Sequence, residues 1–588
     1  MSTTSANWPD AHCDAVTRRD ALTMPHVAHR LRLPIVWTVA LVVVVSGLWF
    51  MPGRASIAPR IEQDNAYIFL AVDRLCTGHG LTSIPPKAPF QPWQWHGDWA
   101  VLTQWPAGYP LLIAAARMLL GTTTAKAAIA LNVFFCGIAL VAWFALVRAC
   151  LPRGLAAWML ALVASASSVS MELLIHPSSD TILVAMVPVV LLLAIKLLRC
   201  ESVKPASDGT ETSASLEAKA SRYFFLGIVA GSLVWIRYAA VFVPAAIGAF
   251  LLFDWLVMRR RGLRDVALFA MSAGLPMIAL VAFNRILGDG VSTQEQFNLG
   301  NRFGFDFSTS MIATAWTHWT SQTLYAYRPE AKWLFVAGLP IAALVGPMLF
   351  SNSRSRLLEL FKNQRMQLAV MFVVALVTVL VTASTLFKGK FDYVGLARYY
   401  EPIKPIYFLM FVGPFLVWKH RIVRGTVVVV SLLAVSWFVQ QDAIRTRDRW
   451  VAADRPFTEY GRWDHRFGPE SRELYQWVGK QAAAHTVVFS NFHDDIALET
   501  GTPVSPAPEN AEALRIWLET ARKVRNVNHL RAIFVFEFDD DSRDYFQPRP
   551  ETLISDLGLV RDENAPEGIK KYVFVPDSDL LAGIQNPS

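Results

Sequence analysis

Charged residues are scarce in this chain of 588 residues. They make up 17% of the sequence, whereas 53% is hydrophobic. Typical soluble domains carry about 25% charged residues, so a string of soluble globular domains is excluded. Cysteine is rare too, and its five copies indicate neither a disulfide framework nor a cysteine-based metal site. The sequence also lacks a visible internal repeat and a glycine-rich loop of the nucleotide-binding type.

The charges that are present divide the chain into two parts. Residues 441–588 hold 18 Lys and Arg against 25 Asp and Glu, a net charge of −7, whereas residues 1–440 hold 37 against 22, a net charge of +15. The overall charge of +8 is therefore not a uniformly basic surface, and it does not indicate a nucleic-acid partner. An acidic, water-soluble tail follows a basic membrane-embedded part.

Apolar runs of the length that crosses a bilayer, about 20 residues, fill the part before the tail. We expect spans at 33–51, 127–147, 154–175, 178–199, 223–258 (long enough for two pieces), 266–285, 331–350, 367–387, 402–418 and 423–440. A shorter apolar helix is expected at 106–120. The chain is thus predicted to be a mainly α, polytopic membrane protein.

The connections rich in Arg and Lys predict the topology, because such loops stay in the cytoplasm. Residues 1–32 form a cytoplasmic N-terminal tail. The loops 52–105, 286–330 and 388–401 and the domain 441–588 then lie outside the cytoplasmic membrane. If 106–120 and 127–147 both crossed, the basic clusters that follow would lie outside the cytoplasm, against the positive-inside rule. One segment is therefore half-crossing, or one run is really two, and the total is odd, about 11 to 13 spans.

The tail alternates helix and strand signals. Helices are expected over Pro469–Ala484, Glu509–Lys523 and a segment closing at Leu557, and strands over Thr486–Ser490, Leu530–Phe538 and Lys571–Val575. This order predicts a small α/β domain with a partly parallel sheet.

The first exterior loop carries the strongest candidate for chemistry. Glu62 and Asp64 lie at the start of a helix whose apolar face predicts that it lies along the membrane surface. Asp64 either caps this interfacial helix or acts as a general base at the water–lipid boundary. Tryptophans 93, 95, 99 and 105 follow, and they form either an interfacial belt or a platform on which a sugar stacks.

Three more places put polar groups at membrane depth, where they are costly and usually functional. Glu172, His176 and Asp180 are spaced for one helical face, next to a break at Pro177, and are weak evidence for a metal site. Arg237 interrupts an apolar run and either pairs with a carboxylate or binds an anion. The third place is the mouth of a late span, which holds Arg398, Tyr399 and Lys404. Its cations either extend to the lipid headgroups or clamp a phosphate.

In this order the motifs resemble the GT-C superfamily of membrane glycosyltransferases, in particular its protein O-mannosyltransferase, lipid A aminoarabinose transferase and arabinofuranosyltransferase groups. The matching segments are Asp64–Tyr67, Gly78–Leu81, Pro106–Leu112, Ser178–Asp180, Gly231–Arg237, Arg398–Pro405 and Ser490–Gly501. Asn65 stands where the family pattern has a second acid, which leaves Glu62 and Asp64 as an alternative acidic pair.

The resemblance implies an enzyme that moves a sugar, with inversion, from a polyprenyl phosphate to an acceptor hydroxyl on a glycan, lipid or protein. It implies that Asp64 is the base and that Arg398, Arg237, Lys404 and Tyr399 bind the donor phosphate. Asp180 and His176 would lie near the acceptor or a divalent cation, for which Asp64, His176 and Asp180 are the candidate ligands. No other cofactor is expected. The loop 286–330, with Arg302, Tyr325, Tyr327 and Arg328, would cover the donor.

Two other functions share some of these features. A transporter or flippase of lipid-linked sugars would also have the spans and the intramembrane arginines, but it usually shows internal repeats and a site at the bilayer midplane. A membrane-anchored assembly protein would act through its tail and would need neither Asp64 nor Arg398.

Overall fold

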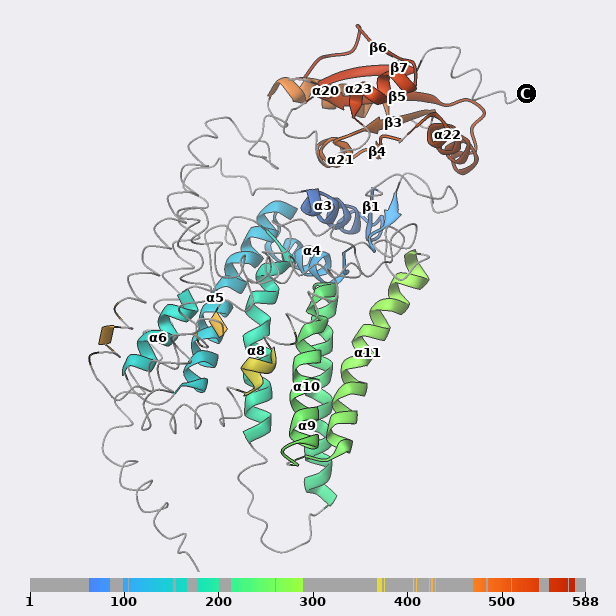
Figure 1. The fold of residues 1–588 in the computed structure, drawn as a ribbon. Coiled ribbons are helices and arrows are strands. Elements are labelled where there is room, and N and C mark those ends of the chain that lie inside the picture. The colour runs from blue at the N-terminus through green and yellow to red at the C-terminus, as the bar shows by residue number, and fades with distance from the viewer. Residues whose placement is uncertain are drawn as a thin grey trace, which may run out of the picture.

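The computed structural model consists of a helical bundle with an α/β domain at one end of it (Figure 1). The residues that it describes are 63–84, 99–103, 105–151, 155–166, 177–199, 213–259, 261–288, 367–372, 375, 405–406, 409, 422, 425–426, 429, 469–482, 485–508, 510–538, 549–568 and 571–576. The expected spans 33–51 and 331–350 lie outside them, as does most of the later bundle. The prediction of a mainly helical membrane protein with a small α/β tail is confirmed.

Four described segments are long and apolar enough to cross a membrane. They are α5 (Thr124–Cys150), residues Ser179–Leu197 of α8 (Ser179–Arg199), residues Tyr238–Leu256, which include α10 (Phe242–Leu256), and residues Leu263–Leu287 of α11 (Leu263–Gly288). These helices agree with the runs expected at 127–147, 178–199 and 266–285. The run expected at 154–175 is described as helix α6 over Leu155–Ala166.

The long run 223–258 is two antiparallel helices. The first is α9 (Ser213–Ser232), and the chain then turns through the short 3-10 helices η2 (Leu233–Trp235) and η3 (Tyr238–Val241) into α10. Near the start of α9, Nζ of Lys219 lies 3.0 Å from the Asp265 carboxylate of α11. At the end of α10, the Asp254 carboxylate lies 2.9 Å from Nε of Arg261. The start of α9, the end of α10 and the start of α11 therefore meet at one end of the bundle, and residues 233–241 turn at the other.

Helix α4 (Gly108–Leu120) does not cross the bundle. At about 1.5 Å per residue it is shorter than the roughly 30 Å hydrocarbon layer. Its start contacts Trp235 in the turn, and near its other end Arg117 bonds both Asp73 and Thr124 at the start of α5. Both ends of α4 thus lie at one end of the bundle, called the capped end here. Within the described residues, α4 thus stays at the capped end, and the run 223–258 forms two helices.

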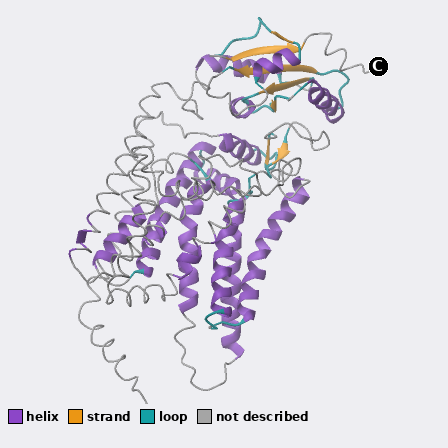
Figure 2. Ribbon diagram, in the orientation of Figure 1, coloured by secondary structure: helices purple, strands orange, loops and turns teal. Residues whose placement is uncertain are grey.

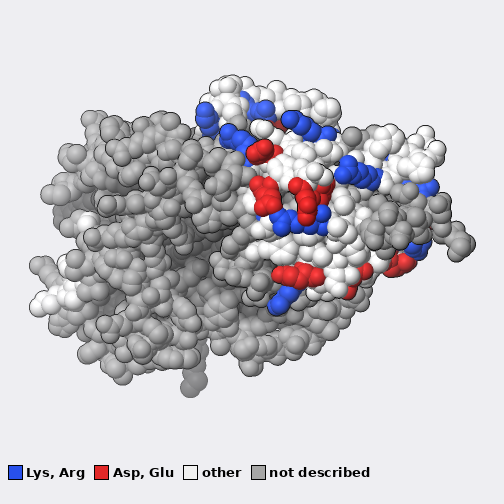
Figure 3. Space-filling view, turned by 90° about the horizontal axis from the view of Figure 1, so that it is seen from above, with Lys and Arg blue, Asp and Glu red and all other residues white. Residues whose placement is uncertain are grey.

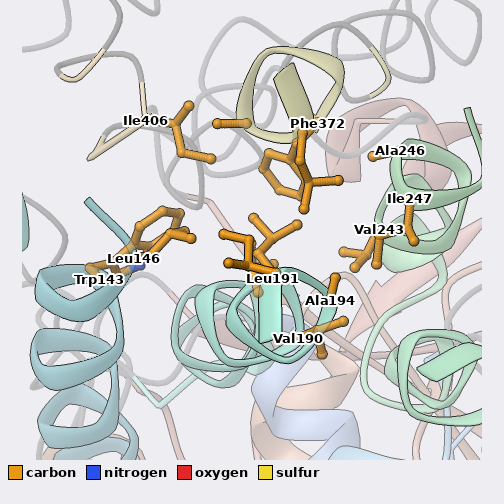
Figure 4. Close-up of a cluster of buried hydrophobic side chains, with 14 of the residues drawn as sticks. Trp143, Leu146, Val190, Leu191, Ala194, Val243, Ala246, Ile247, Phe372 and Ile406 are labelled. Atoms are coloured by element: carbon orange, nitrogen blue, oxygen red, sulfur yellow. The ribbon is translucent and has the colours of Figure 1, made fainter. Parts of the chain in front are cut away.

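Tight packing of small and aromatic side chains holds the bundle together. Trp143 of α5 is fully buried and donates to the Val184 carbonyl of α8 across 2.9 Å, and Figure 4 shows it at one side of the buried cluster that also holds apolar side chains of α8 and α10. Where α9 meets α11, a Cβ added to Gly231 would lie 2.2 Å from the carbonyl oxygen of Ala273. Glycine therefore permits a backbone contact there that no other residue would allow.

At the capped end, α3 (Gln63–Cys76) lies across the bundle beneath the α/β domain (Figure 1). Burial in this helix extends beyond the expected apolar face, because every residue from Asn65 to Val72 is buried. The α/β domain covers the face that would otherwise meet water. A short hairpin of β1 (Thr82–Ser83) and β2 (Ala100–Val101) follows it.

The tail folds as a five-stranded sheet with helices on its faces (Figure 2). The strand order is β4 (Ser505–Pro506), β3 (Thr486–Ser490), β5 (Arg531–Glu537), β7 (Lys571–Pro576) and β6 (Leu559–Arg561). The pairs β3–β4 and β3–β5 are parallel and the others are antiparallel, so the partly parallel sheet is confirmed. The helices are α20 (Pro469–Gln481), α21 (His493–Thr500), α22 (Ala511–Arg525) and α23 (Pro550–Asp556).

The two faces of this sheet pack against different partners. One face, with Val487 and Phe489 of β3, packs against α22 and α23. The other, with Val488, packs together with α20 and α21 against α3 of the bundle. Seen from above, the surface of the domain carries acidic and basic side chains close together (Figure 3), such as the ion pairs of Arg515 with Glu512 and Glu519 on α22.

Candidate active site

The start of α8 places an acid at the capped end of the bundle. Helix α8 begins at Ser179, directly after the break that Pro177 predicts. Asp180 therefore lies in the first turn, where the helix dipole favours a negative charge. Its side chain is only 6% exposed, so the carboxylate is held within the protein rather than in bulk water.

The turn between α9 and α10 brings Arg237 to this acid. Between η2 and η3, Arg237 has an extended backbone (φ −157°, ψ 130°), which ends one helix before the next begins. Its guanidinium Nη1 lies 2.7 Å from the Asp180 carboxylate and donates to the Ser179 hydroxyl across 3.1 Å. The two charged residues thus form a buried ion pair between elements that are far apart in the sequence.

Tyr109, at the start of α4, adds a buried hydroxyl to this region. Its side chain is buried, and within the described residues its hydroxyl has no hydrogen-bond partner. Burial raises the pKa of the Tyr109 phenol, and the negative charge of Asp180 raises it further, so the hydroxyl stays protonated and able to donate. A Cβ on neighbouring Gly108 would lie 2.4 Å from the Trp235 carbonyl oxygen, which shows how closely α4 approaches the turn that carries Arg237.

The same turn is tied to the exterior loop and to α11. The Tyr238 hydroxyl donates to the Thr103 carbonyl across 2.7 Å and accepts from the Asn284 amide across 2.9 Å. These two hydrogen bonds connect η3 to the segment just after β2 and to the last part of α11. The position of Arg237 is therefore fixed from both sides of the turn.

The start of α3 lies beside the same group of residues. Tyr67 stacks on Trp105, with ring centroids 5.1 Å apart. Together with Tyr109 of α4 and Ile182 of α8, Tyr67 belongs to one buried apolar cluster. Asp64 lies in the first turn of α3, three residues before Tyr67. Asp64, Tyr109 and Asp180 lie in the first turns of α3, α4 and α8. These three first turns thus converge on a single cluster at the capped end.

Two of the predicted site residues, Asp180 and Arg237, are brought into contact. For Arg237 this agrees with the alternative in which it pairs with a carboxylate. The backbone of Asp64 is placed in α3, but its side chain lies outside the described residues. So do several other predicted site residues: Glu62, His176, Arg398, Tyr399, Lys404 and residues 289–330 of the expected loop. Within the described part of the chain, no group of three or more His, Cys, Asp and Glu side chains converges on a possible metal position.

The tail also contributes a residue to this region, and the sequence patterns did not single it out. The Tyr67 hydroxyl lies 2.8 Å from Nε2 of His493, at the start of α21. Helix α21 itself was not expected, although Asp494 and Asp495 in its first turn and Gly501 in the left-handed conformation after its end are ordinary helix boundary signals. The two tryptophans of the loop that are described also pack on protein side chains, Trp105 on Tyr67 and Trp99 beneath Arg74.

The fold is similar to that of solved structures with which the chain shares little sequence. The chain is similar to the archaeal oligosaccharyltransferase AglB from Archaeoglobus fulgidus, solved in complex with an inhibitory peptide and a dolichol-phosphate. The TM-score is 0.51 at 11% identity, covering 87% of this chain and 70% of that one. It is also similar to ArnT from Cupriavidus metallidurans in the apo state, with a TM-score of 0.47 at 12% identity, covering 95% of this chain and all of the other. No protein-family model matches the sequence, and no curated protein matches it.

Proposed function

We propose that this protein is an inverting glycosyltransferase that takes its sugar from a polyprenyl-phosphate donor. The observation that carries the proposal is the buried pair of Asp180 and Arg237 at the capped end, next to the helix turn that holds Asp64. The fold supports it, since AglB shares this architecture and was solved with a dolichol-phosphate. Acid and cation at one end of the bundle suit a donor whose lipid lies in the bilayer and whose head lies at the surface.

In the proposed reaction Asp64 takes the proton from an acceptor hydroxyl, and the oxygen attacks the anomeric carbon of the donor sugar. The bond from this carbon to the lipid phosphate breaks, and the phosphate leaves with the bonding electrons. Its growing charge needs cations in a partly dehydrated site. Arg398, Tyr399, Lys404 and Arg237 are assigned to this phosphate, and the carboxylate of Asp180 holds the Arg237 guanidinium in a fixed orientation.

Asp180 and His176 are assigned to the neighbourhood of the acceptor, and Glu62 is the alternative acidic partner of Asp64. If a divalent cation takes part, the candidate ligands are Asp64, His176 and Asp180. The cation would then polarise the leaving phosphate or the acceptor oxygen, and the residues present differ from the family pattern in having Asn65 as the neighbour of Asp64.

The proposed location is the outer face of the cytoplasmic membrane. The end of the bundle opposite the capped end carries Lys196, Lys219, Arg222, Arg259 and Arg264, which the positive-inside rule assigns to the cytoplasm. The two antiparallel helices α9 and α10 put the basic residues before and after them on this same side. The capped end, with the tail domain, is then exterior.

The proposal is tested by measuring donor discharge, which is the release of free undecaprenyl phosphate from the sugar donor. The purified protein in lipid nanodiscs is incubated with a panel of undecaprenyl-phosphate sugars and a cell-envelope extract as acceptor, and the free undecaprenyl phosphate is measured by mass spectrometry. We expect time-dependent release with at least one donor, and a matching loss of a glycan from envelopes of cells that lack the protein. Movement of an intact donor across proteoliposomes without cleavage would favour a flippase. Neither release nor movement would favour an assembly role.

A further inference from the structure

A hydrogen bond joins the tail domain to α3 inside an apolar junction. The contact is the 2.8 Å hydrogen bond between the Tyr67 hydroxyl and His493 Nε2, and both side chains are buried. Around it lie Phe492 and Tyr475 of the tail and Trp105 of the loop that enters α4. A polar contact in such a place restricts geometry more than apolar packing does, because a buried donor or acceptor left unpaired costs free energy.

The imidazole of His493 is kept neutral at this junction. Burial lowers its pKa, against the weaker opposing effects of the Asp494 carboxylate and the Ser490 carbonyl. A neutral imidazole has one nitrogen that donates and one that accepts, so it can form a directed bond with a phenol. A lysine or arginine in its place would bring a buried charge.

The contact bears on Asp64 through the geometry of the helix. Residues three apart are neighbours on a helix surface, so Tyr67 lies directly beside the turn that carries Asp64. Tyr67 is held on one side by the Trp105 ring and on the other by His493. Each of the three comes from a different part of the chain: Tyr67 from α3, Trp105 from the segment that enters α4, and His493 from α21.

We propose that His493 is a positioning residue of the glycosyltransferase: through Tyr67 it fixes the first turn of α3, the turn whose backbone carries Asp64. This inference rests on the proposed function. The tail domain then belongs to the catalytic unit and is more than an appendage. A misplaced base affects the transition state more than it affects substrate binding, so the effect belongs in kcat rather than in KM.

Four variants test the coupling: His493→Leu, His493→Gln, Tyr67→Phe and the double variant His493→Leu/Tyr67→Phe. With the donor identified by the discharge assay, we expect His493→Leu and Tyr67→Phe each to lower kcat by roughly 10- to 100-fold with KM nearly unchanged. The double variant should be no worse than the single ones. Glutamine, whose amide also donates and accepts, should restore a large part of the rate.

Val487→Ala is the matched control, because it removes buried volume from β3 on the sheet face turned away from α3. It should lower the thermal stability of the tail without lowering kcat. If it lowers kcat as much as His493→Leu does, or if the two single effects multiply in the double variant, His493 is only structural and the proposal is wrong.

Hydrogen exchange separates this inference from the proposed function. In His493→Leu the amides of residues 64–68 should exchange faster than in the wild-type protein, whereas those of α8 should not change. If the wild-type protein discharges no donor, the proposed function fails, and the exchange result still decides whether His493 orders the start of α3. If donor is discharged but neither exchange nor kcat responds to His493→Leu, the positioning role alone is refuted.

Discussion

Arg237 Nη1 lies 2.7 Å from Asp180 Oδ1, although the two residues are separated in the chain by most of α8, a linker and α9. The pair is buried where α8 begins and where the chain turns between α9 and α10. Breaking a buried pair by removing one partner leaves an uncompensated charge. The relationship therefore constrains both the stability and the activity of the protein.

The first prediction concerns this pair. Asp180→Asn should lower the free energy of unfolding by about 3 kcal/mol or more, because the Arg237 guanidinium loses its buried counter-charge. The double variant Asp180→Asn/Arg237→Gln should regain much of this stability but no activity, since the cation assigned to the phosphate is gone. Thermal melting in detergent and donor discharge are the two measurements. A double variant that is as unstable as the single one would show that the pair is not the cause.

The second prediction concerns the base. Asp64→Ala should abolish sugar transfer while donor binding is largely kept, since a general base acts mainly in the transition state. The loss in kcat should be about 100-fold or greater. Binding is measured with labelled undecaprenyl phosphate and turnover by mass spectrometry. Transfer at a near-normal rate in Asp64→Ala would show that another residue is the base.

The third prediction follows from the contact between α4 and the turn. Gly108→Ala places a Cβ 2.4 Å from the Trp235 carbonyl oxygen, so α4 must move away and carry Tyr109 with it. We expect donor discharge to fall at least 10-fold, on the scale that a displacement of about 1 Å produces. Gly274→Ala on α11 is the matched control, because nothing lies within 4 Å of its added Cβ. Equal activity in the two variants would contradict the predicted displacement.

The fourth prediction concerns pH. Because burial lowers the pKa of His493 from its ordinary value of about 6.5, the unfolded chain binds the proton more readily than the folded one. Stability from this group is therefore fully present above about pH 6.5 and decreases as the pH falls below that value. The described titratable groups that interact with the imidazole are Tyr67 on α3 and Asp494 on α21.

Melting temperatures of the wild-type protein and of His493→Gln, compared between about pH 8 and pH 5, test this effect. The wild-type protein should lose more stability on acidification than the variant. Parallel curves would mean that other groups dominate the acid response.

Much of the fold could be predicted from sequence because it depends on local pattern. Apolar length identified α5, α8 and α11, and Pro177 marked the break before α8. A short apolar run identified β3 with the bounds that the structure has. The topology could not be settled in this way, because the run 223–258 is long enough for two pieces but its composition does not show where the chain turns. Only the ion pairs of Lys219 and Arg261 at one end and the bonds of Tyr238 at the other show that it folds back.

The candidate site likewise has a part that the sequence predicts and a part that only the tertiary structure shows. The sequence by itself singled out Asp64, Asp180 and Arg237, because charged residues within or beside apolar runs are costly to bury and can be recognised by residue type. Only the tertiary structure decided which of them meet, and that the tail covers α3 and contributes His493 beside Tyr67. Contacts across 426 positions of the chain depend on how whole domains pack, and no local periodicity encodes that packing.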